Sequence, residues 1–140
     1  MSHLGEVQSR LAELEANEAK VLAVSFAPPA MASEYAADHA LPFPIASDVD
    51  RGAYRAFGLA RGDRTTVFRP RAIAQHLGLR LRGFSPGRHQ QEDVYQLGGD
   101  FVVDREGRIV LAHPSVAGDD RAPVTELLDA LRTLRRRRPA

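Results

Sequence analysis

The spacing of hydrophobic residues at the start of the chain predicts an amphipathic helix followed by a buried strand. Over residues 3–17 the apolar side chains recur every three or four positions, with charged residues mostly between them: Leu4, Val7, Leu11 and Leu14. This period places all four on one helical face. The next segment, Lys20–Phe26, reads KVLAVSF and is almost continuously apolar. Such a run indicates an interior strand that is covered on both faces, with Val21–Phe26 at its centre.

Prolines and a glycine divide the following segment. Pro28–Pro29 can open a helix over Ala30–His39, because proline fits the first helical turn, where no N–H donor is needed. A short strand is predicted over Phe43–Ala46, near a sheet edge because prolines flank and interrupt it. A short helix over residues 50–57 then follows two aspartates, and Gly58 can end it in the left-handed conformation.

The last third of the chain contains the clearest local pattern. Phe101–Val103 and Arg108–Ala112 are short apolar strands on either side of Asp104–Gly107, in which the glycine can adopt the positive φ of a tight hairpin. Asp119 or Asp120 is then placed to cap a terminal helix. Its apolar residues fall on one face: Val124, Leu127, Leu128, Leu131 and Leu134.

The order of these elements predicts an α/β fold. Strands alternate with helices, which is typical of layered domains, and a hairpin before the last helix makes the central sheet mixed. A length of 140 residues suits one domain, spanning residues 1–140. Residues 60–95 are the least regular, and we interpret them as an inserted helix followed by a loop.

Composition narrows the possible chemistry. The chain contains no cysteine, which excludes disulfides, thiolate metal sites and cysteine nucleophiles within it. No apolar run approaches the ~20 residues of a membrane span, and the N-terminus lacks the layout of a secretory signal. We therefore expect a cytoplasmic protein without a membrane partner.

Charge is unevenly distributed although the net charge is only +1. Residues 51–90 carry nine arginines and one aspartate, whereas residues 1–50 carry eight acids and two basic residues. The arginines of the tail, Arg135–Arg138, resemble a nucleic-acid patch. Cations at a helix C-terminus also favour the helix dipole and otherwise remain solvated, so we expect no nucleic-acid partner.

Several other constellations lack the spacing that their chemistry requires. The histidines show no spacing that favours a metal site, so neither a metal nor another cofactor is predicted: His3, His39, His76, His89 and His113. Ser25, His113 and Asp104 contain the groups of a hydrolase triad, but Ser25 lacks the GxSxG turn that exposes a nucleophile.

Three stretches carry a resemblance to a known family. They are VLAVSF at Val21–Phe26, DVDRGAYRAFGLARG at Asp48–Gly62 and QLGGDFVVDREGRIVLAH at Gln96–His113. In order and spacing the chain resembles the peroxiredoxin-like branch of the alkyl hydroperoxide reductase and thiol-specific antioxidant (AhpC/TSA) family, within the thioredoxin superfamily. The resemblance implies a thioredoxin-like three-layer fold with a mixed central sheet.

The same resemblance implies where the redox cysteine of the family would lie. It is expected just before residue 1, where a helix start lowers the pKa of a thiol from ~8.5. The N-terminal strand and the cysteine segment are therefore expected to be missing, and no catalytic residue can be carried over. His3, Gly98 and Gly99 are the residues that the resemblance places around the site.

Two functions from different classes remain open. The first is a peroxiredoxin-like antioxidant or thiol-disulfide redox protein, incomplete without a cysteine, with peroxide and a thiol reductant as partners if an upstream cysteine segment exists. The second is a cysteine-free binding or scaffolding module of the same fold. Self-association into a homo-oligomer is compatible with both.

Overall fold

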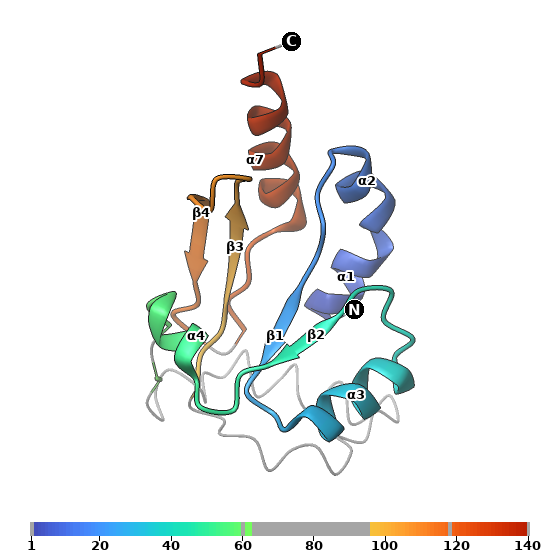
Figure 1. Cartoon of the computed structure of the whole chain (residues 1–140), viewed down its shortest axis with the longest axis vertical. Helices are drawn as coiled ribbons and strands as arrows, with labels where there is room; N and C mark the ends of the chain where they lie inside the picture. The colour runs from blue at the N-terminus through green and yellow to red at the C-terminus, as the bar shows by residue number, and fades with distance from the viewer. Residues whose placement is uncertain (1, 60, 63–95, 118, 140) are drawn as a thin grey trace.

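The structure is a computed structural model of the chain, and it describes residues 2–59, 61–62, 96–117 and 119–139. These ranges contain five helices and four strands, and Figure 1 shows how they are arranged. The predicted insertion at residues 60–95 lies almost wholly outside them. The assignment of residues 1–140 to one domain therefore stays a prediction.

Two short helices form the N-terminal part of the fold. They are α1 (His3–Ser9) and α2 (Leu11–Ala16), and Arg10 between them has φ −111° and ψ 15°, outside the helical region. Ser2 caps α1, because its Oγ accepts a hydrogen bond from the Gly5 N–H at 3.1 Å. The helix predicted over residues 3–17 is confirmed, with a break at Arg10.

The first two strands are parallel and are connected through a helix. β1 (Ala23–Ser25) pairs with β2 (Ile45–Ser47), and Ala23 lies opposite Ile45. The intervening helix α3 (Pro29–Asp38) has Pro29 at its first position, as the sequence predicts. Both strands are shorter than predicted, because regular pairing extends over only three residues of each.

The next elements are a short helix and the predicted hairpin. α4 (Gly52–Ala56) is followed by Gly58 with φ +70°. β3 (Gly99–Val103) pairs antiparallel with β4 (Ile109–Pro114), with a register shift between Val102 and Val103. Gly107 in the turn has φ +82°, which confirms the hairpin and its glycine.

The two pairs of strands form separate two-stranded sheets within the described residues. Within the described part of the chain, the prediction that Val21–Phe26 is an interior strand covered on both faces is wrong. Among the described residues β1 has one hydrogen-bonded neighbour, β2, and Val24 and Leu22 are 41% and 61% exposed. Apolar composition favours a strand, but it carries no information about which neighbours cover that strand.

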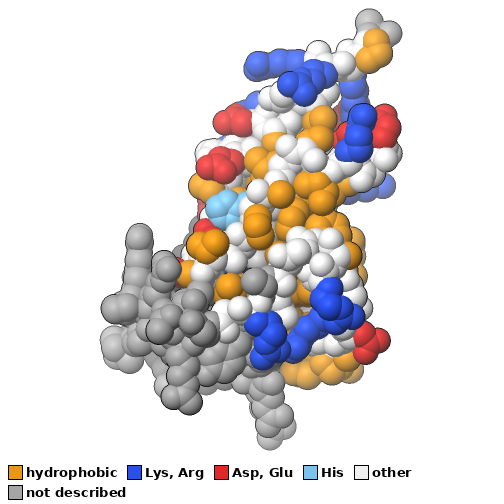
Figure 2. Space-filling view, turned by 90° about the vertical axis from the view of Figure 1, so that its left-hand side faces the viewer, with side chains coloured by type: hydrophobic (Ala, Val, Ile, Leu, Met, Phe, Trp, Pro, Cys, Tyr) orange, Lys and Arg blue, Asp and Glu red, His pale blue; other side chains and the backbone are white. Residues whose placement is uncertain are grey.

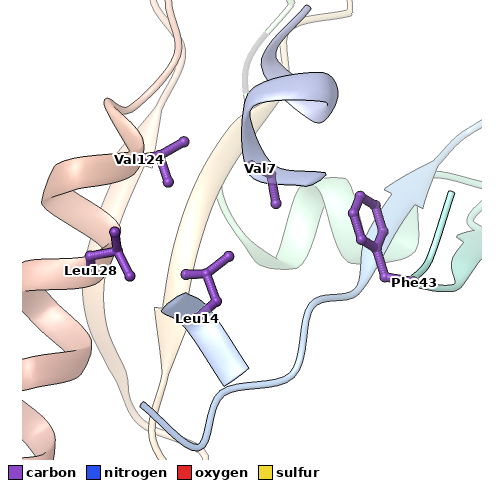
Figure 3. Close-up of a cluster of buried hydrophobic side chains, with 5 residues drawn as sticks. All are labelled: Val7, Leu14, Phe43, Val124 and Leu128. Carbon is purple, nitrogen blue, oxygen red and sulfur yellow. The ribbon is translucent and has the colours of Figure 1, made fainter. Parts of the chain in front are cut away.

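The core lies between the N-terminal helices and the last helix, α7 (Val124–Arg136). Figure 3 shows its five buried side chains converging from α1, α2, α7 and the segment before β2: Val7, Leu14, Phe43, Val124 and Leu128. Val124 and Leu128 are fully buried, so the predicted apolar face of the terminal helix is confirmed.

The predicted cap of that helix is wrong. Pro123 is the N-cap residue and makes no side-chain cap bond. The carboxylate of Asp120 instead accepts a hydrogen bond from the Val116 N–H at 2.8 Å. The helix begins too far along the chain for Asp120 to reach its first turn.

The two faces of the hairpin meet different parts of the chain. Successive residues of a strand point to opposite faces. Asp100 and Val102 face the side where α1 and α7 lie, since Asp100 bonds to His3 and Val102 is buried. Phe101 faces the other side and contacts Phe57, after α4, with 4.8 Å between the ring centroids. The arrangement is a layered α/β fold.

None of the described helices has both the length and the apolar character needed to cross a membrane.

Candidate functional site

Four polar side chains form an alternating row beside the hairpin, here termed the His/Asp row. His3 Nε2 lies 2.6 Å from Asp100 Oδ1, and His113 Nε2 lies 2.7 Å from Asp120 Oδ1. Asp100 and His113 are direct partners in the pairing of β3 with β4. The row therefore runs from α1 across both strands to the segment before α7.

Asp100 is the more buried carboxylate of the row, with a side chain 14% exposed against 25% for Asp120. Its Oδ2 accepts a hydrogen bond from the Ala122 N–H at 2.9 Å, while Oδ1 contacts His3. Burial raises the pKa of Asp100, but the hydrogen bonds from His3 and Ala122 and the nearby charges of His3 and Arg121 outweigh it and lower the pKa below its usual value. Asp100 is consequently a carboxylate at neutral pH.

Asp120 holds the loop between β4 and α7. The pKa of Asp120 is lowered, first by the hydrogen bond from the Val116 N–H and then by the one from His113. Its main-chain oxygen accepts bonds from the buried Ser115 hydroxyl at 2.6 Å and from Arg121 Nη1 at 2.7 Å. The loop is thus fixed by contacts that its own residues supply.

Gly99, which precedes Asp100, sits where no side chain fits. An added Cβ would lie 2.8 Å from Leu59 Cδ2 and 3.0 Å from both the His113 main-chain oxygen and Phe101 Cε2. Real Cβ atoms essentially never come within 3.0 Å of a heavy atom outside their own residue and its two chain neighbours, so an alanine would displace at least one neighbouring group. Close packing therefore accounts for the glycine at this position.

Gly98 has more room. A Cβ there would meet the Arg121 guanidinium at 3.7 to 3.9 Å, an ordinary contact distance. The Gly98 main-chain oxygen accepts a hydrogen bond from the Ser115 N–H at 2.9 Å, which continues the hairpin pairing by one residue.

The structure places one predicted site residue, His3, against Asp100, and the other two are the residues that precede Asp100 in the chain. Gly99 is the first residue of β3, and Gly98 comes directly before it. That these residues surround an active site stays a prediction. Sequence reasoning missed Asp100 and Asp120. One signal in the sequence could have indicated Asp100: it lies two residues before Val102, so the two share a strand face, and an apolar Val102 marks that face as the buried one.

The hydrolase triad considered from the sequence is not assembled. The Oγ of Ser25 accepts a hydrogen bond from the Ala27 N–H at 3.0 Å, and Asp104 Oδ1 accepts from the Glu106 and Arg108 N–H groups in the hairpin turn. His113 pairs with Asp120 instead of Asp104. These contacts give Asp104 the turn role expected of aspartate.

The arginine tail makes contacts within the chain. Arg135 Nη1 donates to the Ala16 main-chain oxygen at 3.0 Å, and Arg138 pairs with Glu18. The tail thereby ties α7 to the end of α2. Over the ranges that the structure describes, no three histidine, aspartate or glutamate side chains gather closely enough to hold a metal ion.

Comparison with known proteins identifies the family. The family model described as AhpC/TSA antioxidant enzyme matches residues 6–116, most of the chain. The chain belongs to the AhpC/TSA family. Its fold is therefore thioredoxin-like, in agreement with the helices and small sheets of the structure. No curated protein and no solved structure gives a match.

Membership of the AhpC/TSA family supports a redox function at the level of the family. The family's chemistry depends on a cysteine thiolate, and the 140 residues contain none. The candidate site of this AhpC/TSA chain therefore consists of the His/Asp row and the two glycines beside it.

Proposed function

We propose that this AhpC/TSA chain takes part in thiol-based reduction of peroxides or disulfides, and that the reacting thiol comes from outside these 140 residues. The observation that carries the proposal is the family match over residues 6–116 in a sequence without cysteine. The geometry supports it, because His3, the first residue of α1, contacts Asp100, which directly follows the glycine pair in the chain.

The proposed reaction has two steps, one with peroxide and one with a thiol reductant. A cysteine thiolate attacks one peroxide oxygen, the O–O bond breaks, and a sulfenic acid forms while hydroxide or an alkoxide leaves; the leaving oxygen takes up the proton that the thiol gave up, which yields water or an alcohol. A thiol reductant then attacks the sulfenic sulfur, releases water and leaves a disulfide, which a second thiol reduces. Peroxide and a thiol reductant are thus the small-molecule partners, and a cytoplasmic location suits this reducing chemistry.

A second function is a cysteine-free binding module of the same fold. Three apolar residues at the turn end of the hairpin are 41 to 48% exposed: Val103, Ile109 and Val110. Figure 2 shows the side of the molecule on which β4 lies, and hydrophobic side chains gather across its middle. Exposed apolar surface favours association with another chain, including a second copy.

Turnover assays separate the two functions. The 140-residue protein with hydrogen peroxide and dithiothreitol should consume peroxide no faster than a heat-treated control. A Ser2→Cys variant places a thiol directly before His3 and should show peroxide turnover. A Ser33→Cys variant, with its thiol on an exposed position of α3, is the matched control. Equal turnover by the two variants would contradict the redox proposal and favour the binding module.

A further inference from the structure

We infer that His3 is the proton acceptor for the reacting thiol and that Asp100 is the residue that positions it. This inference rests on the proposed function and adds the group that would generate the thiolate. It combines three observations: the contact between His3 and Asp100, the second hydrogen bond that fixes Asp100, and the position of His3 at the first residue of α1.

The contact with Asp100 determines which nitrogen of His3 is basic. Because Asp100 is a carboxylate, it can only accept, so His3 Nε2 carries the hydrogen of the 2.6 Å contact. In the neutral ring the lone pair then lies on Nδ1. Within the described part of the chain, no group forms a hydrogen bond with Nδ1, and the His3 side chain is 17% exposed. It is therefore available to a proton donor.

Asp100 is itself held in place. Its second oxygen accepts the Ala122 N–H at 2.9 Å, and its side chain is only 14% exposed. The His3 side chain is 17% exposed, so both groups are shielded from bulk water but remain reachable. In many enzymes a nucleophile is activated by a base that a fixed carboxylate holds in orientation through a hydrogen bond.

The proton transfer balances without a further reactant. The S–H bond of the thiol breaks, the proton moves to His3 Nδ1, and the electron pair stays on sulfur as a thiolate. The imidazolium that forms carries one positive charge, which Asp100 neutralises. The imidazolium in turn stabilises the thiolate and lowers the pKa of the thiol.

Other titratable or charged groups lie on the segments next to this pair. Glu6 lies one turn further along α1, and His113 is the partner of Asp100 across the hairpin. Asp120 and Arg121 come from the segment before α7, where Arg121 lies close enough to lower the pKa of Asp100. In the described residues none of these four groups forms a side-chain hydrogen bond or ion pair with His3, whereas Asp100 does. Asp100 is therefore the group that determines the orientation of His3.

The test measures the pKa of a reporter thiol. Alkylation of the Ser2→Cys thiol by iodoacetamide is followed from pH 5 to pH 10, alone and combined with His3→Gln or Asp100→Asn. We expect a thiol pKa below the ordinary ~8.5 in the single variant. His3→Gln should raise the pKa by about one unit, which slows alkylation at pH 7 about tenfold. Asp100→Asn should raise it less. The same His3→Gln change should leave the Ser33→Cys thiol unaffected.

The outcomes distinguish this inference from the proposed function. A lowered pKa that His3→Gln leaves unchanged would overturn the inference, while peroxide turnover by Ser2→Cys would still support the proposed function. A pKa that responds to His3→Gln in a protein without peroxide turnover would support the inference and contradict the proposed function.

A measurement on the unsubstituted chain covers the case in which the variants fail to fold. Nitrogen-15 NMR of the His3 ring reports the tautomer directly. We expect the neutral ring to carry its hydrogen on Nε2, with Nδ1 unprotonated. A ring that carries its hydrogen on Nδ1 would overturn the inference, because Nδ1 would then have no lone pair to accept a proton.

Discussion

Asp100 and His113 lie directly opposite each other where β3 pairs with β4, and each is bound on its far side to a residue of opposite acid–base type. Asp100 contacts His3, which is 97 residues away in the chain. His113 contacts Asp120, which is seven residues away. One cross-strand pair thus connects α1 with the segment before α7.

Removing the charge of Asp100 should weaken the fold and change its response to acid. Asp100→Asn replaces a hydrogen-bonded carboxylate by a neutral amide, and we expect a loss of about 1–2 kcal/mol in the free energy of unfolding near pH 7. The pKa of Asp100 is lower in the folded state than the ~3.9 of an unfolded chain. Its contribution is therefore present above pH ~4 and is lost as pH falls through the folded pKa.

Urea unfolding of both proteins at several pH values between 2.5 and 7 checks this prediction. The difference between wild type and Asp100→Asn should be largest near neutrality and should shrink below pH 4. Asp38→Asn, an exposed aspartate at the end of α3, makes the same change of charge elsewhere and should have little effect. A constant difference at all pH values would show that the carboxylate charge is not involved.

The two glycines before Asp100 should respond differently to the same substitution. Gly99→Ala forces a Cβ to within 2.8 Å of Leu59 and 3.0 Å of the His113 main-chain oxygen, and we expect about 1–3 kcal/mol of destabilisation. Gly98→Ala adds a Cβ at ordinary contact distance from Arg121 and should change stability by less than about 1 kcal/mol. Thermal unfolding of the pair provides the comparison. Equal losses would mean that the packing around Gly99 is looser than the structure has it.

The core between α1, α2 and α7 should dominate stability. Leu128 is fully buried, so Leu128→Ala should cost about 2–5 kcal/mol in the free energy of unfolding. Leu22→Ala is the control, because Leu22 is 61% exposed and should cost about 0.5 kcal/mol or less. Chemical denaturation measures both. A large loss of unfolding free energy in Leu22→Ala would contradict the exposed position of Leu22 and favour the interior strand predicted from the sequence.

Local patterns allowed much of the fold to be predicted. Gly107 specifies the turn by its own conformational freedom, and the terminal helix is specified by apolar residues three and four positions apart, of which Val124 and Leu128 become fully buried. The family itself was recognisable from three short stretches, and the family model confirms it. These features depend on neighbours that are near in sequence.

The His/Asp row could not be predicted in the same way. His3 and Asp100 come together only after α1 has packed beside the hairpin, and no spacing in the sequence signals a contact across 97 residues. Asp120 was predicted as a helix cap because it precedes an apolar helix, but its carboxylate forms hydrogen bonds with His113 and with the Val116 N–H instead. Which of several suitable partners a carboxylate takes is determined by tertiary packing.

The most direct test of the account is the rate at which a thiol beside His3 reacts with peroxide. The Ser2→Cys and Ser33→Cys proteins are treated with hydrogen peroxide at pH 7 in the presence of dimedone, and the trapped sulfenic acid is quantified by mass spectrometry. A thiol pKa lowered by about one unit raises the thiolate fraction at this pH, so Ser2→Cys should react roughly ten times faster. Equal rates in two folded proteins would contradict the claim that this AhpC/TSA chain retains a site for thiol redox chemistry.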